Sequence, residues 1–333
     1  MSSKEAVDSV LVVNDLSVEF AGARGTVKAL DGVGFSLEKG QVLGVIGESG
    51  SGKSVTMRAI LRILPTKTTK ISGQITVDGE DVLAMNEKQL ARYRGRVASM
   101  IFQEPALSLD PVFTIGHQIA EAVMRHTGAS RENARRRALE MLEKVKIPSA
   151  ESRLRNYPHE MSGGMLQRAM IALALSCDPK VLLADEPTTA LDATVQIQII
   201  LLLRQLQLEM QMATVFVTHD VGVAAEIADQ IAVMYGGRIV EYGAVRDVLM
   251  NPQHPYTKGL LASTIHGSMA GTRINTIPGM PPDLNNMPDG CAFAPRCGHA
   301  HADCHAVSPK LKPLGNGRQV ACVLDHPSLV VQP

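Results

Sequence analysis

The sequence predicts an α/β fold: a phosphate-loop core with an antiparallel β subdomain, a helical insertion and a small cysteine-containing C-terminal extension. Three observations predict it. Short apolar strands in the second half of the chain alternate with a long helix, as in a parallel sheet. A stretch of helical periodicity separates these strands from strand candidates near the start. After residue 250 the composition changes to proline, glycine and histidine, with four of the five cysteines.

The overall composition is that of a globular protein. The chain has 333 residues, of which 45% are hydrophobic and 20% charged, which suffices for one large domain with an appendage or for two domains. Lys plus Arg equal Asp plus Glu at 33 each, so no overall basic charge attracts nucleic acid, and we expect no nucleic-acid partner. Apolar runs such as 169–175 are far shorter than the roughly 20 residues that span a bilayer. The start of the chain has no export signal, so we expect a cytosolic chain without a membrane span.

Strand candidates dominate the first hundred residues. Residues 11–20, 33–37 and 73–77 are apolar or alternating, and they predict a small antiparallel layer. The compact apolar run Gln41–Ile46 predicts a buried strand that leads directly into a glycine-rich loop.

Helical spacing of apolar residues then takes over. It is found at residues 115–126, 131–145 and 165–177, which predicts a helical insertion at about 115–177.

The second half of the chain has the strand–helix–strand order of a parallel sheet. Two buried strands, Val181–Ala184 and Thr214–Val217, enclose the long helix Ala193–Met210. The runs Ile231–Tyr235 and Arg238–Tyr242 are joined by Gly236-Gly237, a dipeptide typical of a hairpin turn. The change of composition predicts a domain boundary near residue 250, between a core domain (1–250) and the extension (251–333).

Residues 47–54 read Gly-Glu-Ser-Gly-Ser-Gly-Lys-Ser and match the phosphate-loop pattern G-x-x-x-x-G-K-[ST]. Glycines let successive N–H groups turn toward an anion, Lys53 can reach the outer phosphates, and the Ser54 hydroxyl can ligate magnesium. A flexible Gly/Ser turn is the alternative, but the preceding strand and a predicted helix at 55–64 favour a nucleotide site and a P-loop NTPase core. The expected phosphate contacts are Gly47, Ser49, Gly50, Gly52, Lys53 and Ser54.

Two carboxylates, Asp185 and Glu186, follow the buried strand Val181–Ala184. Ligands of open α/β sheets lie at the carboxyl ends of the strands. Asp185 is therefore suited to hold the magnesium shell, and Glu186 to orient or deprotonate the attacking water. Such a pair is by itself more often a solvated strand end or a helix cap; the phosphate loop upstream favours the catalytic interpretation.

Further motifs, in order along the chain, make it resemble the ATP-binding cassette (ABC) ATPases. Met161-Ser162-Gly163-Gly164-Met165 resembles the family's signature loop, usually Leu-Ser-Gly-Gly-Gln, which caps the γ-phosphate of ATP bound to the opposing subunit. Ala190-Leu191-Asp192 resembles the loop between the two subunits, although Asp192 alone would be a helix cap. Phe20 lies near the family's aromatic under the adenine, with plain strand packing as the alternative.

The resemblance implies specific roles and ligands. Gln103 would sense magnesium and water, and His219 would contact the γ-phosphate. The implied ligands are ATP and Mg²⁺, with catalytic residues Gln103, Glu186 and His219, magnesium ligands Ser54, Gln103 and Asp185, and further nucleotide contacts from Phe20, Ser162, Gly163, Gly164 and Asp192.

The segment His254–Leu261 and the proline-rich stretch after it are similar to the C-terminal extension of oligopeptide, dipeptide and nickel importer ATPases. The similarity implies an ATP-hydrolysing subunit that energises uptake of peptides or a related small solute. Its implied partners are a second ATPase subunit that is a paralogue, two integral-membrane permeases and, indirectly, an external solute-binding protein. The implied location is peripheral, at the cytoplasmic face of the inner membrane. The alternative is a soluble ABC-type ATPase of translation, repair or metal-cluster assembly, but the chain has no second cassette and no long coiled coil.

Four cysteines of the extension, Cys291, Cys297, Cys304 and Cys322, are spaced C-x5-C-x6-C-x17-C. Four thiolates suffice for tetrahedral zinc or for a [4Fe–4S] cluster, and the spacing does not choose between them. Resemblance to dipeptide-type relatives that carry an iron–sulfur cluster favours the cluster over zinc. Unligated buried thiols are the third interpretation.

Overall fold

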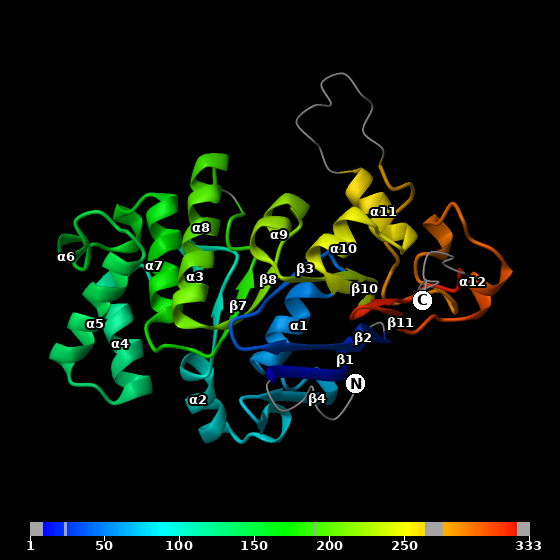
Figure 1. The fold of residues 1–333 in the computed structure, drawn as a ribbon. Coiled ribbons are helices and arrows are strands. Elements are labelled where there is room, and N and C mark those ends of the chain that lie inside the picture. The colour runs from blue at the N-terminus through cyan, green and yellow to red at the C-terminus, as the bar shows by residue number, and fades with distance from the viewer. Residues whose placement is uncertain (1–8, 23–24, 190, 264–275, 325–333) are drawn as a thin grey trace. The chain divides into compact units, whose positions relative to one another are not determined.

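The computed structural model describes residues 9–22, 25–189, 191–263 and 276–324 (Figure 1). The chain divides into two compact units, and each is assembled from segments that are far apart in the sequence. The first unit comprises Met1–Val12, Ser36–Gln41 and Ile75–Phe216. The second comprises Val13–Phe35, Val42–Gln74 and Val217–Pro333.

A four-stranded sheet contains the N-terminal strands, in the order β2-β1-β4-β5. Its members are β1 (Ser9–Gly22), β2 (Gly25–Glu38), β4 (Thr69–Val77) and β5 (Glu80–Asp81). The three strands expected in this region are confirmed. However, β2 begins at Gly25 rather than at Val33, because its first residues are largely exposed and lack the apolar alternation that identifies a strand in a sequence.

In the second unit, β3 (Val42–Ile46) is buried at every residue and runs parallel to β9 (Gln230–Tyr235). β9 turns through Gly236-Gly237, both with positive φ, into the antiparallel strand β10 (Arg238–Ala244). The buried strand and the hairpin are therefore confirmed. Helix α1 (Lys53–Ile60) follows the glycine-rich loop and ends before residue 64, because Arg62 adopts a left-handed backbone conformation.

The C-terminal extension continues the same sheet. β12 (Arg318–Val320) pairs antiparallel with β10, so that Val320 lies opposite Glu241. β11 (Lys312–Gly315) pairs in turn with β12, and the order within this unit is β11-β12-β10-β9-β3. Neither strand is evident from the sequence, since both are short and β11 is mostly exposed.

Short helices complete the second unit. They are α9 (Val221–Ile227), α10 (Val245–Met250), α11 (Pro255–Ala262), the 3-10 turn η3 (Ala294–Arg296) and α12 (Ala302–Ala306).

In the first unit, three buried strands have the order β8-β7-β6, and β6 and β7 are parallel. They are β6 (Ala98–Ile101), β7 (Val181–Asp185) and β8 (Ala213–Val217). Helix α8 (Ala193–Met210) has the predicted bounds. The turn η1 (Val82–Ala84) and helix α2 (Glu87–Arg96) precede β6, and helix α3 (Pro105–Ser108) follows it.

The middle of the first unit is helical and corresponds to the predicted helices. α4 and α5 pack against each other and against α7 (Figure 1). The helices are α4 (Ile115–Thr127), α5 (Arg131–Lys144), α6 (Ala150–Arg153) and α7 (Gly163–Leu175), with the turn η2 (Pro158–Glu160) before α7. All three predicted helices are confirmed, with ends shifted by at most two residues, because their apolar positions form the buried faces.

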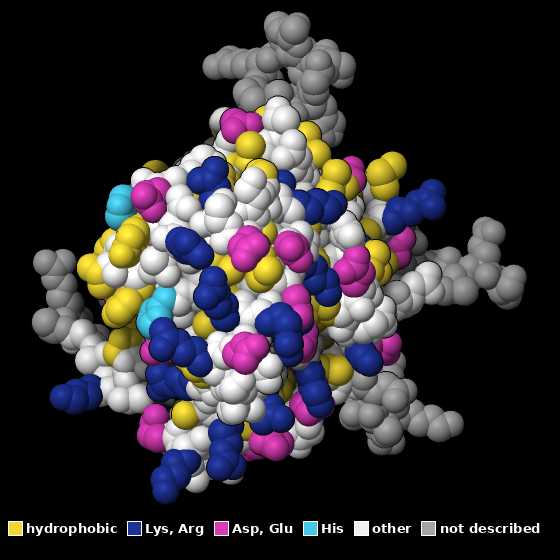
Figure 2. Space-filling view, turned by 90° about the vertical axis from the view of Figure 1, so that its left-hand side faces the viewer, with side chains coloured by type: hydrophobic (Ala, Val, Ile, Leu, Met, Phe, Trp, Pro, Cys, Tyr) yellow, Lys and Arg dark blue, Asp and Glu magenta, His cyan; other side chains and the backbone are white. Residues whose placement is uncertain are grey.

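Within the described ranges, no helix combines the length and the apolar character that crossing a membrane requires. On the face drawn in Figure 2, Lys and Arg side chains are interspersed with Asp and Glu. Both sheets and the surrounding helices together give the α/β architecture that the sequence predicts.

Candidate functional site

The loop Gly47–Ser54 connects β3 with α1 in the second unit, and two of its glycines are required by close packing. Gly47 has φ 153°, and a Cβ there would lie 2.2 Å from the carbonyl oxygen of Met234. Gly52 has φ 105°, and its Cβ would lie 2.6 Å from Leu30 Cδ2. Since a side chain fits at neither position, the loop can wrap closely only with glycine there.

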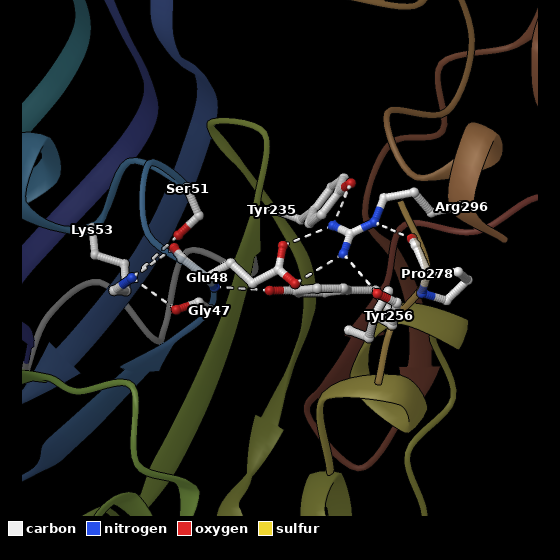
Figure 3. Close-up of polar contacts among 9 residues, drawn as sticks. Gly47, Glu48, Ser51, Lys53, Tyr235, Tyr256, Pro278 and Arg296 are labelled. Carbon is white, nitrogen blue, oxygen red and sulfur yellow. Dashed lines mark hydrogen bonds and ion pairs between the residues drawn. The ribbon is translucent and has the colours of Figure 1, made fainter. Parts of the chain in front are cut away.

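Lys53 lies at the centre of this loop and is 6% exposed. Its Nζ donates hydrogen bonds to the carbonyl oxygens of Gly47 and Glu48, at 2.8 and 2.9 Å (Figure 3). Helix α1 begins at the same residue, so the positive end of the helix dipole lies at the end of this loop. This arrangement is suited to bind an anion such as a phosphate group.

A cavity of about 300 Å³ adjoins the loop within the second unit. The loop residues Glu48–Ser51 form part of its wall, together with Tyr235 and the segment Pro281–Asn285 of the extension. Tyr235 and Pro281–Asn285 are not predicted from the sequence to belong to the site, because no motif connects them with the phosphate loop.

Two other predicted residues belong to the second unit. His219 follows β8 and is exposed, and the next residue, Asp220, caps α9 by accepting hydrogen bonds from the N–H groups of Gly222 and Val223. Phe20 lies near the end of β1 and is half-buried.

In the first unit the structure brings Gln103 and Glu186 together. Glu186 follows β7 in a left-handed conformation with φ 46°, and Asp185, the last residue of the strand, is 3% exposed. Gln103 Nε2 donates to Glu186 Oε2 at 3.3 Å, and Thr189 Oγ1 donates to the same oxygen at 3.0 Å. Two donors thus orient the carboxylate; Thr189 is a contact that the sequence analysis missed.

The signature-like turn begins α7. Ser162 is the N-cap residue, and its Oγ accepts a hydrogen bond from the Met165 N–H at 3.4 Å. Ser162 and Gly163 are exposed, whereas a Cβ on Gly164 would lie 3.0 Å from Val195 Cγ1. The turn therefore presents an exposed serine and glycine at a helix N-terminus, which is the geometry of an anion contact as well as of an ordinary helix start.

Asp192 caps α8, because its Oδ1 accepts a hydrogen bond from the Val195 N–H at 3.0 Å. Ala190, in the same predicted loop, lies outside the described residues.

The prediction of a metal centre in the extension is wrong. In the part of the chain that the structure describes, no group of three or more His, Cys, Asp or Glu side chains can hold a metal ion. The [4Fe–4S] cluster expected at Cys291, Cys297, Cys304 and Cys322 therefore has no support in the structure, and neither has zinc, its alternative.

The thiols of the extension are instead partly or fully buried. Burial raises the pKa of Cys291, Cys297 and Cys322, and the repulsion between neighbouring thiolates adds to the rise. Cys304, which is also buried, joins the loops by accepting a hydrogen bond at its carbonyl from the Cys291 N–H. The four thiols lie near enough to influence one another's pKa, but the spacing of cysteines along a loop does not determine whether they form a metal site.

Comparison with known proteins agrees with the geometry of the loop. Residues 30–189 match the ABC transporter family, and residues 240–304 match the C-terminal region of oligopeptide/dipeptide transporters. The oligopeptide transport ATP-binding protein OppD of Salmonella typhimurium is 47% identical, over 94% of this chain and 93% of that protein. The dipeptide transport ATP-binding protein DppD of Bacillus subtilis is 44% identical, over 96% of this chain and 95% of that protein.

Among solved structures, the chain is similar to a dimeric post-hydrolysis state of the ATP-binding cassette MJ0796 bound to ADP and Pi. The two have a TM-score of 0.63 and 28% identity over 71% of this chain and 99% of that one. OppD and DppD match this chain at 47% and 44% identity over nearly their whole length. The chain therefore belongs to the ATP-binding proteins of ABC transporters, which are ATPases, and to the branch that has the oligopeptide/dipeptide transporter C-terminal region.

Proposed function

We propose that this chain is the ATP-hydrolysing subunit of an importer that energises the uptake of peptides or a related small solute. The observation that supports this most strongly is the glycine-requiring loop around Lys53, in a chain that is similar over nearly its whole length to proteins named for oligopeptide and dipeptide transport. A soluble ATPase of translation, repair or metal-cluster assembly is not favoured by these relatives. We further propose a nucleotide-binding domain at 1–250, with its helical insertion at 115–177, and an extension at 251–333.

Each polar group of the site has a role in this proposal. The loop N–H groups and Lys53 bind the phosphates of ATP, while Ser54, Asp185 and Gln103 hold the magnesium ion. Glu186 orients or deprotonates the attacking water, His219 contacts the γ-phosphate, and Phe20 packs under the adenine. The two hydrogen bonds that Glu186 accepts support its role, because they fix the direction in which its carboxylate points.

The site is completed by a second ATPase subunit, which we expect to be a paralogue. Ser162, Gly163 and Gly164 then cap ATP on that subunit, and Asp192 lies in the loop between the two subunits. The exposure of Ser162 and Gly163 supports this, as does the dimeric form of the similar cassette MJ0796. Two membrane permeases and an external solute-binding protein complete the transporter, and the chain is attached peripherally at the cytoplasmic face of the inner membrane.

The proposal is tested by Glu186→Gln in the complex purified from detergent extracts. Glutamine keeps the shape of the side chain but cannot take a proton, so we expect ATP binding to be retained and hydrolysis at this site to fall by about 100-fold or more. The matched control is Glu209→Gln, which removes the charge of an exposed carboxylate on α8. Unchanged hydrolysis in Glu186→Gln would refute the assignment of the base. Purification without permease subunits would refute the transport role.

A further inference from the structure

Arg296 belongs to the C-terminal extension, yet its guanidinium contacts the phosphate loop within the second unit (Figure 3). Its Nη1 and Nη2 donate to the two carboxylate oxygens of Glu48, at 2.7 and 3.1 Å. The Arg296 side chain is 6% exposed and that of Glu48 is 26% exposed. This hydrogen bonding raises the pKa of Arg296 above its ordinary value. A two-pronged pair of this kind fixes the orientation of the carboxylate.

The backbone of Glu48 is held from the extension side too. Its N–H donates a hydrogen bond to Tyr256 Oη at 2.9 Å. Tyr256 is fully buried and packs against Tyr235 and Phe293, with ring centroids 4.5 and 5.4 Å away. Burial raises the pKa of Tyr256, so the phenol keeps its proton while its oxygen accepts this bond. Glu48 is therefore fixed at both its side chain and its N–H group by residues outside the loop.

Arg296 also ties the loop to two other segments. Its Nη1 donates to Tyr235 Oη at 3.2 Å, and its Nε donates to the carbonyl of Pro278 at 2.8 Å. The segment that contains Pro278 continues to Pro281–Asn285, which lines the cavity beside the loop. One guanidinium group thus joins the phosphate loop, strand β9 and the segment that leads into the cavity wall.

We propose that Arg296 is a positioning residue for ATP binding: by holding Glu48, it keeps the phosphate loop in the conformation that receives the phosphates. The loop lysine depends on this conformation, because Lys53 Nζ donates to the Glu48 carbonyl. A loop that is held less firmly must be ordered when the nucleotide binds, and that ordering lowers affinity. This inference rests on the proposed function, and it adds to it a role for the extension in setting nucleotide affinity.

The test compares Mg-ATP affinity of the full chain by titration calorimetry in the native protein and in Arg296→Met. Methionine keeps the apolar part of the side chain and removes the guanidinium group, so we expect the dissociation constant for Mg-ATP to rise by about tenfold. In the assembled transporter, the loss should fall on KM rather than on kcat. The matched control is Arg238→Met. The Arg238 side chain pairs with Asp31 and donates a hydrogen bond to Ser308 of the extension. Among the contacts of the described residues, this side chain has none with the phosphate loop. Arg238→Met should therefore lower the stability of the chain and leave its affinity for Mg-ATP unchanged.

Further variants separate positioning from plain stability. Arg296→Lys retains the positive charge but lacks the guanidinium group that donates two hydrogen bonds to Glu48, so it should bind Mg-ATP with an affinity between those of the native chain and Arg296→Met. Tyr256→Phe removes only the hydroxyl and should also weaken binding. In a double-mutant cycle, Arg296→Met should have little further effect once Glu48→Gln is present.

The inference is overturned if Arg296→Met binds Mg-ATP as tightly as the native chain. If Arg296→Met does not fold, the inference is overturned when Tyr256→Phe and Glu48→Gln both bind Mg-ATP as tightly as the native chain. It is also overturned if Arg238→Met weakens binding equally. Absence of Mg-ATP binding by the native chain would instead refute the proposed function itself.

Discussion

Single residues of the phosphate loop make contacts that the sequence pattern of the loop does not specify. The pattern leaves position 48 open to any residue. In the structure, however, both the side chain and the N–H group of Glu48 contact the extension. The glycines differ as well. Gly47 and Gly52 face backbone or side-chain atoms that a Cβ would meet, whereas a Cβ on Gly50 would meet nothing within 4 Å.

This difference predicts unequal effects of two alanine substitutions. Both Gly47 and Gly50 have positive φ, so both variants strain the backbone. Only Gly47→Ala adds a clash, with the carbonyl oxygen of Met234. We expect Gly47→Ala to lower the free energy of unfolding by about 2 kcal/mol more than Gly50→Ala does. Guanidinium unfolding without nucleotide measures this, and equal losses would show that the loop adjusts around a side chain at 47.

Helices of the first unit begin at capping residues that are local in sequence. Ser130 caps α5 by accepting a hydrogen bond from the Asn133 N–H at 3.3 Å, and Ser162 caps α7 in the same manner. These caps were not used in the prediction. The apolar spacing predicted α4, α5 and α7 closely, because it depends on residues within a few positions of one another. Helix α2 was missed: it is mostly exposed, and Arg94 and Gly95 interrupt its helical backbone.

The two caps allow a test of the signature-like turn. Ser162→Ala and Ser130→Ala should each lower the free energy of unfolding by about 1 kcal/mol, since each loses one cap. In the assembled transporter, only Ser162→Ala should also lower ATP hydrolysis, because we propose that Ser162 contacts ATP on the second subunit. Chemical unfolding and a steady-state ATPase assay give the two readouts. Equal rates of ATP hydrolysis in the two variants would show that Ser162 acts only as a helix cap.

On the scale of the whole molecule, the extension is built into the second unit rather than attached to its surface. β12 adds to the edge of β10, and Arg318 pairs there with Glu241, which is fully buried. Glu241 also accepts hydrogen bonds from the N–H groups of Gln253 and His254, each at 2.9 Å. The carboxylate thus holds three segments together.

This buried pair predicts a large loss of stability in Arg318→Met. Removal of the cation leaves the Glu241 carboxylate buried without its ion pair, and we expect the free energy of unfolding to fall by about 3–5 kcal/mol. The control is Arg137→Met, which removes a more exposed pair with Asp178 in the first unit and should cost about 1 kcal/mol or less. Denaturant unfolding of both variants measures the difference. Similar losses would mean that the Glu241 site is accessible to water.

The sequence by itself determined the phosphate loop, the acidic residues at the end of β7, the hairpin and the main helices. Each of these depends on neighbouring residues, whose chemistry and spacing are fixed by the backbone. Only the tertiary structure decided that the extension cysteines form no metal site, that β12 joins β10, and that Arg296 meets Glu48 from 248 positions away. The physical reason is that contacts between distant segments depend on how sheets and loops pack, and residue spacing along the chain does not specify that packing.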